Sequence, residues 1–264
     1  AEDADSDGEE GKFYVWTQEE IERILGKKDA ALFLKLYRFE KDGNFLDEAT
    51  HQKTGVNIPH LRKSLDQHAK DQNQDSEEFR KKINSLHSKL FAYRKKRIHP
   101  QKDDKVLTDW NGLMISTFAQ SAKALNQKKY LNIAQKAADF CLSELRQKNG
   151  RLLKRWRKGK AGLPGHLEDY AFLTQGLLDL YEASFEIKYL RASIELVDLT
   201  LKHFEDRTEG GFFLTANDGE KLLIRAKEIY DGAIPSGNSV MALNLLRVHK
   251  ITGKEEYLNS AEDL

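Results

Sequence analysis

The sequence predicts an all-α fold, an incomplete (α/α) six-hairpin barrel with short β-hairpin pieces in the loops between its helices. A helical repeat occurs three times, each repeat pairs a charge-free helix with an amphipathic one, and only four prolines interrupt 264 residues. A helix that is apolar all round must be covered on every side, whereas an amphipathic helix buries one face. Inner helices wrapped by outer helices satisfy both requirements. An antiparallel bundle or an open solenoid is the alternative, but a solenoid would not need fully buried helices in each unit.

The outer helices are recognised by a shared Tyr-Leu pair. It occurs in "KKYLNIAQKAADF" from Lys128, "IKYLRASIELVDL" from Ile187 and "EEYLNSAEDL" from Glu255. In the second of these, apolar residues recur at steps of three and four, which predicts an amphipathic surface helix. The same spacing predicts a long outer helix after Asp75 and Glu78, which are placed as a capping box.

The inner helices lack charge over long stretches. These are "WNGLMISTFAQSA" from Trp110, "YAFLTQGLL" from Tyr170 and "GAIPSGNSVMALNLL" from Gly232. We expect one barrel domain over residues 1–264, cut at both ends from a longer chain, because the repeats begin and stop in mid-pattern.

Short apolar pieces that start at glycine are expected to form a loop and a strand between helices. They are Glu10–Thr17, Asp42–Leu46, Asn149–Trp156 and Glu209–Thr215. The acidic opening "DADSDG" begins like an EF-hand loop, but Tyr14 stands where that loop needs a bidentate Glu. We therefore interpret it as a connecting turn rich in Asp and Gly, and expect no metal and no cofactor.

Composition narrows the partners and the compartment. The net charge of +1 favours neither nucleic acid nor a membrane surface, and no apolar stretch is long enough to span a bilayer. The basic run Tyr93–Pro100 is interpreted as a helix end, where cations suit the dipole. The single cysteine, Cys141, is expected to be a core thiol in a reducing compartment, so we expect a cytoplasmic protein.

Polar residues cluster at the N-terminal ends of the inner helices. Because the inner helices of such a barrel run the same way, these ends should meet at one mouth. Carboxylates, amides and aromatic rings that converge there suit a sugar, since rings stack on it and fixed polar groups bind its hydroxyls. The candidate catalytic residues are Asp104, Asp109, Glu168, Asp169 and Asp231, and the candidate binding residues are Trp110, Asn111, Trp156, His166, Tyr170, Ser236 and Asn238.

Helix capping is the competing explanation for each of these residues taken singly. Asp109 before Trp110 and Ser236 before Gly237 are good N-cap candidates. Capping does not explain three titratable groups in "HLED" or three carboxylates in "DDKVLTD". Asp169 and Asp231 are the preferred acid and base, with Asp104 in reserve.

Five motifs resemble the YyaL family, which includes the mammalian spermatogenesis-associated relative. They are "DADSDGEEGKFYVWT", "DDKVLTDWNGLMI", "LEDYAFLTQGLLDLYEA", "GGFF" and "DGAIPSGNSV". The resemblance implies a C-terminal helical barrel similar to six-hairpin glycosidases and N-acylglucosamine 2-epimerases, and a thioredoxin-like domain elsewhere in the parent chain. Glu168 replaces the first Asp of the family's "DDYA", and Asp109 stands where Ser is common.

Two functions follow from the residues and the resemblance. The first is a carbohydrate-active enzyme, either glycoside hydrolase-like or sugar epimerase-like, and the abundance of carboxylates favours hydrolysis, which needs two carboxyl groups. The second is a non-catalytic domain that binds a sugar or a partner and accompanies a thioredoxin-like domain.

Overall fold

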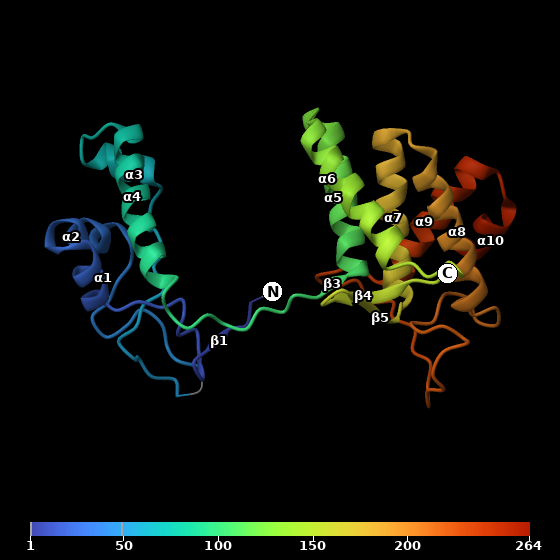
Figure 1. The fold of residues 1–264 in the computed structure, drawn as a ribbon, viewed down its shortest axis with the longest axis horizontal. Coiled ribbons are helices and arrows are strands. Elements are labelled where there is room, and N and C mark those ends of the chain that lie inside the picture. The colour runs from blue at the N-terminus through green and yellow to red at the C-terminus, as the bar shows by residue number, and fades with distance from the viewer. Residues whose placement is uncertain (1, 49) are drawn as a thin grey trace. The chain divides into compact units, whose positions relative to one another are not determined.

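The computed structural model describes residues 2–48 and 50–264, and most of them are helical. The described chain divides into an N-terminal unit that ends at Asp103 and a C-terminal unit, Asp104–Leu264 (Figure 1). Each unit has its own apolar core. The expectation of one barrel domain over the whole chain stays a prediction.

The N-terminal unit is built on four helices, α1 (Gln18–Leu25), α2 (Lys27–Leu36), α3 (Leu65–Asp71) and α4 (Ser76–Arg94). The long helix expected after Asp75 is α4, and the Asp75 carboxylate accepts hydrogen bonds from the amides of Glu77 and Glu78. Phe79 and Ile83 of α4 pack with Ile21 and Phe33 to form the centre of this core.

The acidic opening forms a tight hairpin. Strands β1 (Asp5–Ser6) and β2 (Glu9–Glu10) pair antiparallel around Asp7 and Gly8. Both turn residues have positive φ, 53° and 76°, as a two-residue primed turn requires. Lys12 forms ion pairs with Asp7 and Glu9. The expected connecting turn is therefore found, and within the described residues no cluster of three or more His, Cys, Asp or Glu has the geometry of a metal site.

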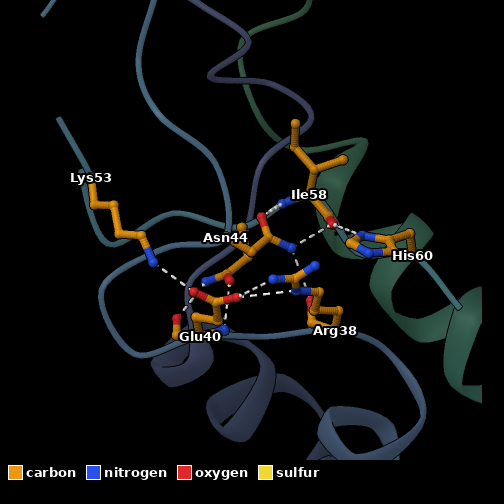
Figure 2. Close-up of polar contacts among 7 residues, drawn as sticks. Arg38, Glu40, Asn44, Lys53, Ile58 and His60 are labelled. Atoms are coloured by element: carbon orange, nitrogen blue, oxygen red, sulfur yellow. Dashed lines mark hydrogen bonds and ion pairs between the residues drawn. The ribbon is translucent and has the colours of Figure 1, made fainter. Parts of the chain in front are cut away.

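The connection from α2 to α3 is a loop organised by polar contacts (Figure 2). The Asn44 amide donates to the Ile58 carbonyl and accepts from the Ile58 amide, both at 2.9 Å. The Glu40 carboxylate binds the Arg38 guanidinium and, at 2.6 Å, the Lys53 ammonium (Figure 2). The prediction of a strand over Asp42–Leu46 is wrong. This segment forms turns and bends held by side-chain hydrogen bonds and has no β-ladder pairing. Glu10–Thr17 is likewise mostly turn, with one bridge from Trp16 to Asn57.

The C-terminal unit consists of three helical hairpins (Figure 1). They are α5–α6 (Thr108–Leu125 and Lys128–Glu144), α7–α8 (Leu167–Ser184 and Ile187–His203) and α9–α10 (Gly237–Thr252 and Glu255–Glu262). The inner helix α7 packs against both α5 and α9, and α6, α8 and α10 each pack on their own hairpin partner. The charged residues of the inner helices lie towards their ends, outside the charge-free stretches. The expected inner and outer helices are therefore present.

The contacts between the inner helices show that these helices run parallel, because residues further along one helix contact residues further along the next. A Cβ on Gly112 of α5 would lie 2.4 Å from the Phe172 carbonyl carbon of α7, and one on Gly176 would lie 2.6 Å from the Gly112 oxygen. Further along, Ser116 hydrogen-bonds to Asp179. Between α7 and α9, Gly237 contacts Leu167, and Arg247 reaches Asp179. All three N-termini therefore lie at one end.

A small antiparallel sheet lies at the start of α5. Its strands are β3 (Val106–Leu107), β4 (Leu153–Arg157) and β5 (Lys160–Pro164), in the order β3-β4-β5. Leu107 pairs with Arg155, so β4 runs beside the first residues of α5. The strand expected within Asn149–Trp156 is thus found, whereas Glu209–Thr215 contributes only the bridge from Glu205 to Phe212.

One helix boundary differs from expectation. The helix expected from Gly232 begins at Gly237, because the Ser236 side chain caps it and the preceding residues form a loop.

Cys141 is buried, as expected, and burial raises the pKa of its thiol to about 12. No helix in the described part of the chain is long and apolar enough to cross a membrane.

Candidate functional site

The N-termini of α5, α7 and α9 meet, as the sequence predicts. The Asp109 amide on α5 donates a hydrogen bond of 3.1 Å to Asp169 on α7. A Cβ added to Gly237 on α9 would lie 3.3 Å from the Glu168 amide nitrogen. Glycine at this position therefore lets α9 approach the first turn of α7.

Asp169 is the most enclosed carboxylate of the site, with no exposed surface. Its Oδ1 accepts from the Asp109 amide, and its Oδ2 accepts from the His166 amide at 2.8 Å. Burial raises the pKa of Asp169 to about 7, against the opposing effect of Lys154 and of these amides. Asp169 thus joins the starts of two inner helices and carries a proton for part of the time near neutral pH.

Lys154 is a site residue that the sequence interpretation missed. Its Nζ lies 3.4 Å from Asp109 Oδ2 and 3.5 Å from Asp169 Oδ2. Burial works against the ammonium, yet the two carboxylates raise the pKa of Lys154 above its ordinary value. The sequence shows a lysine in the strand that precedes "HLED". Only the pairing of β4 with β3 brings this lysine close to both carboxylates.

The first turn of α5 corrects one prediction. Asp109 is not the N-cap, because α5 begins at Thr108. Leu107, the last residue of β3, occupies the N-cap position and makes no side-chain capping hydrogen bond. The Asp109 carboxylate accepts from the Trp110 amide, and the Asn111 side-chain amide donates to the Leu107 carbonyl. The Trp110 side chain is 54% exposed beside them.

His166 and Glu168 lie on the first turn of α7. His166 is the N-cap residue, and burial together with the positive charge of Lys154 lowers the pKa of its imidazole. Glu168 is half-buried, and within the described residues its carboxylate has neither a hydrogen bond nor an ion pair. It is thus a carboxylate at the mouth whose acceptor capacity is unused.

Other candidate residues use their polar groups inside the fold. The Tyr170 hydroxyl is buried and accepts from the Leu152 amide at 3.0 Å. The Asn238 side chain is buried, accepts from the Phe212 amide and donates to the Phe212 carbonyl. Trp156 packs edge to face against Phe140, with ring centroids 5.7 Å apart.

Asp231 and Ser236 organise the start of α9. Ser236 caps the helix by accepting from the Ser239 amide, as predicted. Asp231 accepts from the Ser236 amide at 2.8 Å and from the Ser239 hydroxyl at 3.0 Å, and these bonds lower the pKa of its carboxyl.

Asp104 forms an ion pair with Arg157, which lowers the pKa of Asp104. The catalytic roles of Asp104, Asp169 and Asp231 stay predictions.

No family model matches the chain. Spermatogenesis-associated protein 20 of Homo sapiens is 37% identical over 98% of this chain and 36% of its own length. An uncharacterised protein of Caenorhabditis elegans is 32% identical over 99% of the chain and 38% of its own. The chain thus spans a little over a third of the curated relatives it matches.

Solved structures support the fold, among them an epimerase. Cellobiose 2-epimerase from Spirochaeta thermophila aligns with a TM-score of 0.52 and 17% identity, over 62% of this chain and 43% of that one. At this identity the likeness concerns the fold alone. The 37% identity over nearly the whole chain shows that it is a homologue of spermatogenesis-associated protein 20, and its fold is the helical-hairpin fold of six-hairpin α/α barrel enzymes.

Proposed function

We propose that the end of the inner helices binds a sugar-like molecule, and that the chain is part of a carbohydrate-active enzyme working by acid–base chemistry. One observation carries this proposal. The N-termini of α5 and α7, joined by the hydrogen bond from Asp109 to Asp169, carry an exposed Trp110 and an unpaired carboxylate, Glu168, next to His166. An aromatic face beside polar groups suits a sugar ring and its hydroxyls.

Each residue has a distinct role in this proposal. Trp110 stacks on the sugar, and Glu168 serves as the general acid or base because its oxygens are uncommitted. His166 is the second proton carrier, since its lowered pKa keeps the imidazole neutral and able to accept a proton. Asp109, Asp169 and Lys154 fix the helix starts that hold these groups.

Two reactions fit this set of groups. Hydrolysis of a glycoside needs two carboxyl groups across the scissile bond. The candidates for the second are the carboxylates that also hold the helix starts, Asp109, Asp169 and Asp231. Epimerisation needs a base and an acid, which His166 and Glu168 supply. The fold neighbour is a cellobiose 2-epimerase, which supports testing both reactions on disaccharides.

The test is to incubate the chain with a panel of glycosides and reducing disaccharides in D2O. Hydrolysis releases new reducing ends, and epimerisation by proton abstraction places deuterium on the sugar carbon. Loss of a general acid–base group costs about 10²–10⁴-fold in rate, so E168Q should lose at least about a hundredfold. E195Q is the matched control, because Glu195 lies on the outer helix α8 and pairs with Arg146. Unchanged turnover in E168Q would remove Glu168 from the mechanism.

A second function has its own support. The carboxylates of Asp169 and Asp231 each accept two hydrogen bonds from within the chain, as structural caps do. A non-catalytic sugar- or partner-binding domain that accompanies a thioredoxin-like domain would need no free pair of carboxylates. Saturable sugar binding without hydrolysis or deuterium uptake would favour this function.

A further inference from the structure

The N-terminal unit contains a cavity of about 640 Å³ that the proposed function does not use. It lies between α1, α2, α4 and the loop residues Ile58 and Pro59. Its floor is formed by buried apolar side chains, among them Ile21, Phe33 and Leu90. This volume falls within the range of about 300–1,000 Å³ that is typical of small-molecule sites.

The walls of the cavity are mainly aromatic. Phe33 and Tyr37 stack with ring centroids 4.3 Å apart, and Trp16 also lines the cavity. At the rim, Ile58 and Phe91 remain 51% and 50% exposed. Flat walls and an open apolar rim suit a flat apolar ligand body.

A polar pair lies within this apolar lining. The Tyr37 hydroxyl and His87 Nε2 are 2.5 Å apart. Burial lowers the pKa of His87 and raises that of Tyr37, so the pair is neutral near pH 7. A neutral pair offers one further donor and one further acceptor, which can orient a ligand without attracting a charge.

The charged group of the cavity is Arg94, from the basic run at the end of α4. Its guanidinium lies 5.5–5.7 Å from the ring centroids of Phe13, Tyr14 and Phe91, and it forms no ion pair within the described residues. Arg97 in the same run is different, because it binds Glu20 and the carbonyls of Phe13 and Val15. The run ends α4 as expected, with Arg94 in the last turn, but this placement gives the donors of Arg94 no anion.

We propose that this cavity binds a small aromatic carboxylate, with the ring between the aromatic walls and the carboxylate on the Arg94 guanidinium. Arginine presents a planar fork that matches a carboxylate with two parallel hydrogen bonds. The binding is non-covalent, and it lies entirely within the N-terminal unit.

The loop wall of the cavity at Ile58 is held by hydrogen bonds from within the N-terminal unit. Asn44 holds both backbone groups of Ile58, and the Ile58 carbonyl also contacts the His60 ring at 3.1 Å (Figure 2). A wall fixed by side-chain hydrogen bonds need not be ordered on binding, which favours affinity.

The test uses 2-naphthoate and its neutral analogue 2-naphthamide, titrated into the 264-residue chain and followed by calorimetry and ligand-observed NMR. We expect saturable one-to-one binding of 2-naphthoate and weaker binding of 2-naphthamide. R94Q should weaken 2-naphthoate at least about tenfold, which is about 1.4 kcal/mol, and leave 2-naphthamide unchanged. R94K keeps the charge without the planar fork and should give an intermediate affinity, which also serves if R94Q folds poorly.

R23Q is the matched control, because Arg23 also lies over an aromatic ring of this unit, that of Tyr93, but does not line the cavity. It should bind 2-naphthoate like the unmodified chain. The proposal is overturned if 2-naphthoate shows no saturable binding, if R94Q and R94K both bind it as tightly as the unmodified chain, or if R23Q loses as much affinity as R94Q.

Discussion

At the scale of single residues, the pKa of Asp169 is set by two opposing effects. Two backbone amides and Lys154 favour its charged form, whereas complete burial favours the protonated form. Burial is the larger effect, so the pKa rises to about 7. The folded state therefore holds a proton that the unfolded chain releases at lower pH.

This raised pKa gives a signed prediction for stability. Between about pH 4 and pH 7 the folded chain binds more protons at Asp169 than the unfolded chain, so this group's contribution to stability is lost as pH rises. D169N does not titrate and should cost about 1–3 kcal/mol, because its amide cannot accept the His166 hydrogen bond. The difference in melting temperature between the unmodified chain and D169N should therefore be largest near pH 4 and shrink towards pH 8.

Asp231 provides the control of opposite sign. Its pKa is lowered, so its contribution is present at neutral pH and is lost as pH falls. The difference between the unmodified chain and D231N should shrink on acidification. If the D169N difference instead grew as pH rose, Lys154 and the amides would outweigh burial.

The sequence predicts the role of a site residue when local hydrogen bonds position it, and fails when contacts between distant segments do. Ser236 was found as a cap because a local hydrogen bond to Ser239 defines it. Asp109 was misplaced as a cap because α5 begins at Thr108, directly after Leu107, and the pairing of Leu107 with Arg155 is not local. Lys154 was missed for the same reason, since its carboxylate partners come from two other elements.

At the scale of elements, the inner helices pack through glycine. The contact of Gly112 and Gly176 brings the backbones of α5 and α7 too close for any side chain between them. The charge-free stretches predict buried helices, which α7 confirms, whereas α5 leaves Met114 exposed and α9 leaves Leu243 exposed. The sequence alone did not show which positions make the closest contact, because Gly112 and Gly176 meet only once the helices run parallel.

G112A tests this packing. The added Cβ would lie 2.4 Å from the Phe172 carbonyl carbon, so the helices must separate. Overpacking of this kind typically costs about 1–3 kcal/mol, which a shifted urea midpoint would show. G162A is the control, because nothing lies within 4 Å of a Cβ there and Gly162 has no positive φ. Equal stability of the two variants would contradict the close approach.

At the scale of the whole molecule, the described chain holds two cores made from different residues. One gathers side chains of α1 to α4, and the other gathers those of the three hairpins. The repeat pattern predicted the hairpins correctly because it comes from helices of two kinds. It did not predict the division after Asp103. The amphipathic pattern of α4 shows that one face of the helix is buried but does not show which core that face joins.

Hydrogen exchange can decide whether these cores unfold as one domain. Ile83 is fully buried in the first core, and Leu177 is fully buried in the second. Truncating either to alanine should cost about 2–5 kcal/mol in its own core. Because each core is a separate cluster, we expect I83A to speed amide exchange only in residues up to 103, and L177A only in residues 104–264. A single barrel domain predicts that either substitution speeds exchange throughout the chain, and that outcome would show that the two cores fold cooperatively.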